Sequence, residues 1–197
     1  MKSKLTTRII GGVHKGKQLE LPSLEVTRSS KSILKESFFN VVQFEIIDTV
    51  FIEAFGGSGS VGLEAVSRGA KEAYFCEIDR KSYKTLQKNC NTIDPSKTTA
   101  ILGDTFQKVP QVLEQLKNRK DEIILYIDPP FDFRDGMNEI YEKTFDIVRD
   151  IENDNVMMVV FEHMTTLQMS ETLGRFTKYK SKKFGKSSLT YYSIPQE

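Results

Sequence analysis

Cysteine and histidine are scarce in this 197-residue chain, which has two Cys, two His and no Trp. Cys76 and Cys90 are too far apart to form a CxxC pair, and His14 and His163 stand alone. Neither a zinc site nor a disulfide framework is therefore predicted. No apolar run approaches the roughly 20 residues that cross a bilayer, and Met1–Lys4 leads into no apolar signal core. We expect a cytoplasmic protein with no membrane segment and no metal ion.

Charge, by contrast, is abundant and unevenly distributed. Behind the net charge of +1, residues 1–35 carry eight Lys and Arg against two Glu, a net charge of +6. Residues 174–197 carry six Lys and Arg against Glu197, a net charge of +5, which leaves −10 for the middle of the chain. Two basic ends around an acidic body favour a polyanionic partner held by the flanks. Solvated surface lysines explain the same counts equally well.

Residues 123–131 combine the signature of a buried strand with an unusual end. The first five residues are apolar, which is typical of a short strand buried on both faces of a parallel sheet. Pro129 and Pro130 end the strand, because proline lacks the N–H that a sheet needs. Asp128 is thus expected at the carboxyl end of an interior strand, where ligands bind in α/β sheets. Its carboxylate, the Pro129 carbonyl and the Phe131 ring predict a clamp for a flat group that carries an NH2.

The pattern of the whole chain predicts an α/β fold with an N-terminal extension. From residue 49 onward, apolar strand patterns alternate with helical patterns, which predicts a parallel, doubly wound sheet. The expected strands are 50–55, 72–77, 98–102, 123–127 and 156–161, followed by an antiparallel pair at 176–184 and 189–194. We expect residues 49–197 to form one compact domain. Residues 1–48 are expected to add a small β-hairpin and a helix that begins near Ser29 or Ser30.

A glycine-rich turn follows the first of these strands. Residues 57–62 fit G-x-G-x-x-G, and Glu77 ends the next strand, where it can accept both hydroxyls of a ribose. The turn and Glu77 fit a nicotinamide dinucleotide and S-adenosylmethionine equally, and a plain strand-to-helix turn is the alternative. Glu53 favours S-adenosylmethionine, because a carboxylate there repels a pyrophosphate and pairs with an ammonium group.

The Asp-Pro-Pro-Phe tetrapeptide is the second argument for S-adenosylmethionine. The exocyclic amine of a nucleobase is a poor nucleophile, and the Asp128 carboxylate with the Pro129 carbonyl can aim its lone pair at a methyl donor. Phe131 is expected to stack on the base, after the base leaves any helix. The expected catalytic residues are Asp128, Pro129, Pro130 and Phe131.

Asp104 and Phe106 are expected to meet the adenine of the cofactor, although Asp104 fits a helix N-cap equally well. Asp79 is more typical of a helix cap than of a ribose ligand. His163, at the end of a strand, is more typical of an ordinary strand-end residue than of a general base. The expected cofactor-binding residues are Glu53, Phe55, Gly57, Ser58, Gly59, Glu77, Asp104, Phe106 and Asp128.

Four groups of residues together resemble the ribosomal small-subunit RNA methyltransferase D family, and they span nearly the whole chain. The chain departs from the usual family pattern by Glu53 in place of Asp, by Gly56 in place of Ala, and in the helix at 28–30 and 32–33. The matching groups are Arg8-Ile9-Ile10-Gly11-Gly12 with Lys15-Gly16 and Leu19, Thr27-Arg28 with Lys35-Glu36 and Phe39-Asn40, Phe55-Gly56-Gly57-Ser58-Gly59 with Gly62-Leu63-Glu64-Ala65 and Ser67-Arg68-Gly69-Ala70, and Asp128-Pro129-Pro130-Phe131.

The resemblance implies a Rossmann-like class I methyltransferase fold, with a seven-stranded, mostly parallel sheet and an antiparallel C-terminal hairpin. It also implies methylation of a guanine N2 amine in 16S rRNA of the small ribosomal subunit. The extension 1–48 would then bind RNA, and the chain is expected to be a monomer. The expected substrate-binding residues are Arg8, Lys15, Lys17, Arg28, Lys35 and Phe131.

Three alternatives stay open at this point. An adenine or cytosine N-methyltransferase acting on DNA or RNA could use the same tetrapeptide. The glycine turn and Glu77 alone also fit a nicotinamide-dependent oxidoreductase. A non-catalytic RNA-binding protein that keeps a cofactor pocket is the third.

Overall fold

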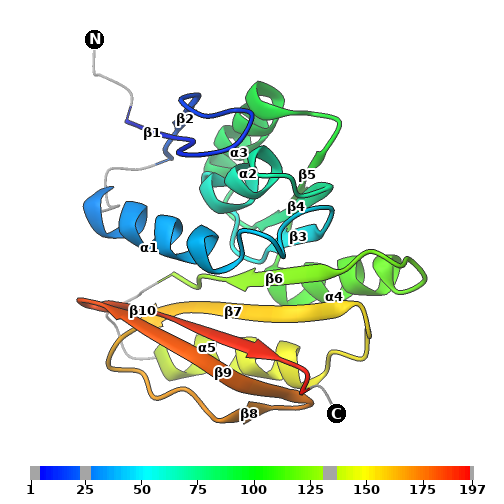
Figure 1. Cartoon of the computed structure of the whole chain (residues 1–197). Coiled ribbons are helices and arrows are strands. Elements are labelled where there is room, and N and C mark those ends of the chain that lie inside the picture. The colour runs from blue at the N-terminus through cyan, green and yellow to red at the C-terminus, as the bar shows by residue number, and fades with distance from the viewer. Residues whose placement is uncertain (1–4, 23–27, 131–136, 196–197) are drawn as a thin grey trace.

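The computed structural model describes residues 5–22, 28–130 and 137–195, with only the backbone for residues 28–31, 137 and 138. Two β-sheets and five helices make up these residues (Figure 1). In chain order the elements are β1 Thr6–Arg8, β2 Gln18–Glu20, α1 Arg28–Val41, β3 Val50–Glu53, α2 Ser60–Ser67, β4 Glu72–Glu77, α3 Arg80–Ile93, β5 Thr98–Leu102, α4 Thr105–Leu116, β6 Ile123–Ile127, α5 Met137–Arg149, β7 Val156–Met164, β8 Thr172–Leu173, β9 Phe176–Phe184 and β10 Ser187–Ser193.

The main sheet has eight strands in the order β5-β4-β3-β6-β7-β10-β9-β8. The five strands from β5 to β7 are parallel, and β10, β9 and β8 pair antiparallel. After β3 the chain first builds outward through β4 and β5 and then returns to place β6 on the other side. The neighbours β3 and β6 therefore mark the topological switch point, where open α/β sheets form their ligand crevice.

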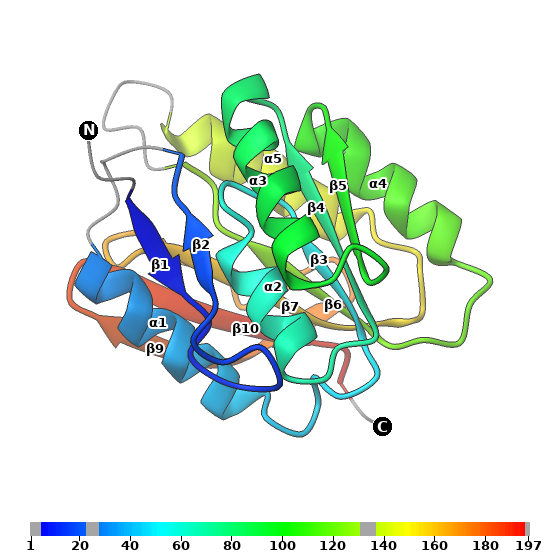
Figure 2. The same cartoon turned by 90° about the horizontal axis from the view of Figure 1, so that it is seen from above.

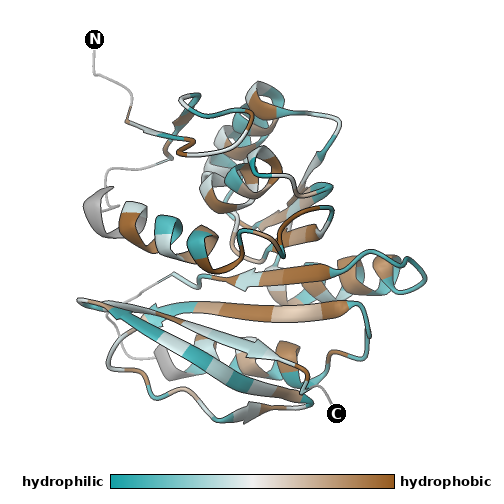
Figure 3. Cartoon of the chain, viewed as in Figure 1, coloured by the Kyte–Doolittle hydropathy of each residue, from teal (hydrophilic) through white to brown (hydrophobic). Residues whose placement is uncertain are grey.

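Helices cover both faces of the sheet, as the two perpendicular views show (Figures 1 and 2). On one face, α1, α2 and α3 pack over an apolar cluster that includes Phe38, Phe51 and Tyr126. On the other face, α4 and α5 pack over a second cluster that includes Phe145 and Phe161. The interior strands β6 and β7 are apolar throughout most of their length, whereas β9 alternates with polar residues (Figure 3). This difference follows from burial, because β6 and β7 have helices on both faces.

The hairpin of β1 and β2 forms a separate two-stranded sheet beside α1 and α2 (Figure 2). Its connecting turn rests on the last turn of α2. The Val13 N–H donates to the Ser67 carbonyl at 2.8 Å, and the Ser67 hydroxyl donates to the Gly11 carbonyl at 2.6 Å. On the β2 side, Asn89 of α3 accepts from the Glu20 N–H at 2.9 Å and donates to the Glu20 carbonyl. The hairpin is thus tied to the domain through its backbone.

Gly12 permits this close approach, and its replacement is a test of the docking. Its φ is +75°, and a Cβ at this position would lie 1.8 Å from the Ser67 carbonyl oxygen. We expect Gly12→Ala to lower the free energy of unfolding by about 2–5 kcal/mol, from left-handed strain and overpacking together. Urea unfolding would measure it. Gly16→Ala is the matched control, since Gly16 has φ +89° with no atom within 4 Å of the new Cβ, and it should cost only about 1–2 kcal/mol. Equal effects of the two variants would contradict the docking argument.

The predicted fold class is confirmed, with one addition. The predicted bounds of β4, β5, β6 and β9 are those of the structure, and the N-terminal hairpin is present. An eighth, two-residue strand, β8, pairs with β9 at the end of the sheet. The helix of the extension is more integral than expected, because Leu34, Phe38 and Phe39 of α1 are buried in the same cluster as the sheet. The boundary at residue 48 therefore separates no independent core.

Candidate functional site

A cavity of about 600 Å³ opens at the switch point between β3 and β6. Its floor is formed by the ends of β3, β6 and β7 and by the glycine turn after β3. The hairpin and α1 close its other side. Among its lining residues are Arg8, Glu53, Gly57, Ser58, Asp128 and Glu162. Catalytic and cofactor-binding residues predicted from separate parts of the sequence thus meet in one cavity.

Two carboxylates hold the glycine turn in place. Glu77 Oε2 accepts from the Gly57 N–H at 2.8 Å, and its Oε1 accepts from the Asp79 N–H at 2.8 Å. Glu53, which is only 5% exposed, accepts from the Gly62 N–H at 2.8 Å. A carboxylate oxygen can accept more than one hydrogen bond, so these contacts leave Glu53 and Glu77 able to bind a ligand also. The turn is held in one geometry by the same acids that were expected to bind the cofactor.

Asp104 and Phe106 lie apart from this cavity. Asp104 accepts from the Phe106 N–H at 3.0 Å and caps α4, as one of its two predicted roles requires. Both residues line a second cavity of about 610 Å³ between α4 and α5. The Phe106 ring meets the Phe55 ring edge-on, with centroids 6.2 Å apart, and Phe55 lines the first cavity. The ring pair of Phe55 and Phe106 therefore lies between the two cavities. The contact of Asp104 and Phe106 with adenine stays a prediction. Asp79 is confirmed as a helix cap, accepting from the Ser82 N–H.

Asp128 follows β6 at the floor of the cavity. It is half-buried, and Pro129 after it is buried while Pro130 is exposed. The placement at the carboxyl end of an interior strand is the predicted one. Phe131 lies outside the described residues, so its expected stacking role stays a prediction.

Two further polar residues in this cavity were missed by the sequence reasoning. Tyr126, 1% exposed, donates its hydroxyl to Glu162 Oε2 at 2.8 Å, and Glu162 is 3% exposed. Burial, followed by the charges of Glu162 and Asp128, raises the pKa of the Tyr126 hydroxyl well above its ordinary value, so it stays a donor. Strand alternation was the available signal, since Tyr126 and Asp128 are two residues apart and share a face.

The expected substrate-binding cations have different environments. Arg8, Lys15 and Lys17 are exposed on the hairpin, with the Lys17 ammonium 3.2 Å from the Thr92 carbonyl oxygen. Lys35 lines the cavity and is already paired within the protein, and its expected contact to the substrate stays a prediction. It is 5% exposed, and its Nζ lies 3.2 Å from Glu64 and donates to the Arg8 carbonyl. The side chain of Arg28 lies outside the described residues.

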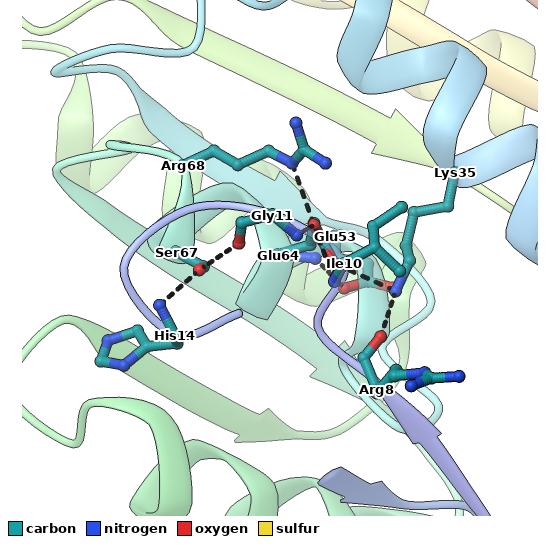
Figure 4. Close-up of polar contacts among 10 residues, drawn as sticks. Arg8, Ile10, Gly11, His14, Lys35, Glu53, Glu64, Ser67 and Arg68 are labelled. Carbon is teal, nitrogen blue, oxygen red and sulfur yellow. Dashed lines mark hydrogen bonds and ion pairs between the residues drawn. The ribbon is translucent and has the colours of Figure 1, made fainter. Parts of the chain in front are cut away.

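Glu64 is the centre of a buried polar cluster that ties the hairpin to α1 and α2 (Figure 4). It is fully buried, and the N–H groups of Ile10 and Gly11 donate to it at 2.9 and 2.7 Å. Arg68 also donates to it at 2.9 Å, besides the ion pair with Lys35. The cluster, defined as Glu64, Lys35, Arg68 and the backbone of residues 10–11, fixes one wall of the cavity.

Two absences hold for the part of the chain that the structure describes. It contains no helix of the length and apolarity needed to cross a membrane, and no group of three His, Cys, Asp or Glu suited to a metal ion. Cys76 and Cys90 are buried free thiols, and burial raises the pKa of Cys76 to about 12. His163 does not line the cavity of Asp128. Its Nε2 lies 2.8 Å from the Thr190 hydroxyl, and burial lowers the pKa of its imidazole.

Comparison with known proteins gives a consistent result. A model of the family described as conserved hypothetical protein 95 matches residues 7–193. Ribosomal RNA small subunit methyltransferase D of Haemophilus influenzae is 34% identical over 66% of this chain and 67% of its own. The solved structure of the Escherichia coli protein yhhF is 26% identical, with a TM-score of 0.73 over 98% of this chain and 99% of that one. An RNA methyltransferase from Salinibacter ruber, solved with S-adenosyl-L-homocysteine, shares the fold at 14% identity and a TM-score of 0.59 over 84% of this chain and 92% of that one.

Proposed function

This chain belongs to the conserved hypothetical protein 95 family, and we propose that it methylates the N2 amine of a guanine in small-subunit ribosomal RNA. S-adenosyl-L-methionine is the methyl donor, and S-adenosyl-L-homocysteine is the product. The observation that carries the proposal is the position of Asp128, at the end of β6, in one cavity with Glu53 and the glycine turn. The rRNA methyltransferase relative named above supports the class of substrate. A cytoplasmic location is part of the same proposal.

The polar groups of the cavity, together with Glu77 behind the glycine turn, fit S-adenosylmethionine. Glu53 and Glu77 provide carboxylates for its ammonium group and ribose hydroxyls, and the turn at 57–59 provides close backbone approach. When bound, the cofactor supplies an activated methyl group for direct displacement. A pyrophosphate would meet the buried Glu53 carboxylate, which disfavours a nicotinamide dinucleotide.

The residues of this chain then act on the base amine. Asp128 accepts one N–H of the amine and the Pro129 carbonyl accepts the other, which aims the nitrogen lone pair away from both acceptors. Positive charge develops on the nitrogen as it forms its new bond, and the Asp128 carboxylate stabilises that charge. No prior deprotonation of the amine is needed. Once the bond from sulfur to the methyl group has broken, the methylated nitrogen releases one proton through Asp128 to solvent, which gives the neutral product.

The basic side chains of the hairpin provide the contacts to the RNA backbone. Arg8 lines the cavity, and Lys15 and Lys17 are exposed on the same hairpin, where they would contact phosphates of the target strand. These contacts position the RNA and carry no base preference of their own. Arg28 and Phe131 complete the proposed set. Within this proposal residues 1–48 are the part that binds RNA, and one chain suffices for the site.

Nucleoside analysis tests the proposal directly. Tritiated S-adenosylmethionine is offered with undermethylated small subunits, with free 16S rRNA and with DNA, and each product is hydrolysed to nucleosides. We expect label in N2-methylguanosine from ribosomal material and none from DNA. Label in methyladenosine or methylcytidine would replace the proposal by the adenine or cytosine alternative. Calorimetric binding of NADH in place of S-adenosylhomocysteine would indicate an oxidoreductase. RNA binding without any turnover would indicate a non-catalytic protein.

A further inference from the structure

Glu162 is a second carboxylate placed next to Asp128 in the cavity wall. It lies on β7, one residue beyond Phe161, and Phe161 pairs with Ile127 of β6. The same register places Glu162 beside Asp128, since neighbouring strands of a sheet are about 4.7–4.9 Å apart. Asp128 and Glu162 both line the cavity. Tyr126, which lies on the core side of them, lines it too. Two acids at adjacent strand ends therefore face one ligand space.

Tyr126 holds the Glu162 side chain in position. The Tyr126 hydroxyl donates to Glu162 Oε2 at 2.8 Å, and the Tyr126 ring packs edge-on against Phe38 with centroids 5.1 Å apart. With the ring fixed in the core, the hydroxyl fixes the direction of the carboxylate. Tyr126 is in this sense a positioning residue.

Packing alone does not require an acid at this position. Val160, two residues earlier on the same strand face, is fully buried and apolar. Burying a carboxylate is unfavourable unless its acceptors are used, and a second carboxylate beside it adds repulsion. A ligand that brings two adjacent N–H donors would add one hydrogen bond to each of the two carboxylates.

Guanine is the nucleobase that brings such a pair. Its N1–H and its N2 amine are donors on neighbouring atoms, whereas adenine and cytosine place an acceptor nitrogen next to their amines. A carboxylate only accepts hydrogen bonds, so it attracts the N1–H of guanine and repels a ring acceptor. Resting on the proposed function, we propose that Glu162 accepts the N1–H of the target guanine while Asp128 accepts from its N2 amine. Glu162 is thus the residue that selects guanine over adenine and cytosine.

The purine 2-aminopurine separates this role from a structural one. It keeps the 2-amine but has an acceptor at N1 and lacks O6. Its N1 meets the Glu162 carboxylate unfavourably, and the Glu162→Gln variant separates this contact from any effect of the missing O6. In a short RNA that carries the guanine methylated by the wild type, that guanosine is replaced by 2-aminopurine riboside. The wild type should prefer guanine by at least about 10²-fold in kcat/KM. Glu162→Gln, whose amide can donate to the N1 acceptor, should bring the preference to within about tenfold.

Matched variants control the measurement. Glu152→Gln removes an acid whose side chain is 87% exposed, and it should leave the preference unchanged. Tyr126→Phe removes the hydroxyl but keeps the acid, so turnover should fall while the preference for guanine persists. Thermal melting and calorimetric binding of S-adenosylhomocysteine report whether each variant is folded.

The results that overturn the inference differ from those that overturn the function. An unchanged preference in folded Glu162→Gln, or equal losses on both substrates, would show that Glu162 does not read N1. If that variant does not fold, a wild type that methylates 2-aminopurine within about threefold of guanine overturns the inference just as well. Absence of N2-methylguanosine from the wild-type reaction would instead refute the proposed function.

Discussion

Replacing Asp128 by alanine is expected to reduce kcat for methyl transfer by about 10²–10³-fold or more. In the proposed mechanism the carboxylate both orients the amine and stabilises the charge that develops on it, so its loss acts on the transition state. Binding of S-adenosylhomocysteine should change by less than about 1 kcal/mol, because the charged contacts to the cofactor are proposed to come from Glu53 and Glu77. Single-turnover kinetics with the unmethylated target RNA and calorimetry with S-adenosylhomocysteine measure the two quantities separately.

Asp128→Asn is the informative partner of this variant. It keeps the shape and one acceptor oxygen but loses the negative charge, and charged hydrogen bonds are roughly twice as strong as neutral ones. We therefore expect its kcat to lie between those of the wild type and Asp128→Ala. Turnover of Asp128→Ala within about tenfold of the wild type would remove Asp128 from the mechanism.

Most of the fold could be predicted because its signals are local. The strand at 72–77 ends at an acid, and the strand at 98–102 ends at Gly103, so their bounds could be taken directly from the chain. The strand at 123–127 ends at Asp128, because the two prolines that follow lack the N–H group that pairs strands. Residues 172–173 carry no such pattern, because a two-residue strand is defined by its partner β9 rather than by its own sequence.

The site was predictable only in part, because its remaining contacts join distant residues. Glu64 is separated by 53 and 54 residues from the backbone groups it binds, and in sequence it is an ordinary acid in a short helix. Glu162 and Tyr126, 36 residues apart, meet through the pairing of β6 with β7. The charge of Lys35 is visible in the sequence, whereas its pairing with the buried Glu64 is not. Pattern analysis thus finds strand ends and turns, while long-range pairing decides which charges are free.

Glu64→Gln is expected to lower the free energy of unfolding by about 3–5 kcal/mol, the usual effect of breaking a buried ion pair. Glutamine offers one acceptor oxygen in place of two. Its NH2 group is a donor, and it would face the backbone N–H groups that donate to the Glu64 carboxylate. It also leaves the Lys35 ammonium, 5% exposed, without its counter-charge. Urea unfolding measures the loss, and hydrogen exchange at the Gly11 amide should become faster, because that amide donates to Glu64 at 2.7 Å.

A surface variant and a double variant show whether the loss of stability comes from the buried cluster or only from the change of net charge. Glu114→Gln removes an acid whose side chain is 74% exposed and lies 3.7 Å from Lys117, so it should change stability by less than about 0.5 kcal/mol. Adding Lys35→Met to Glu64→Gln removes both buried charges, so the double variant should recover part of the loss. A loss below about 1 kcal/mol for Glu64→Gln, or strict additivity in the double variant, would mean that the hairpin is held by packing rather than by this carboxylate.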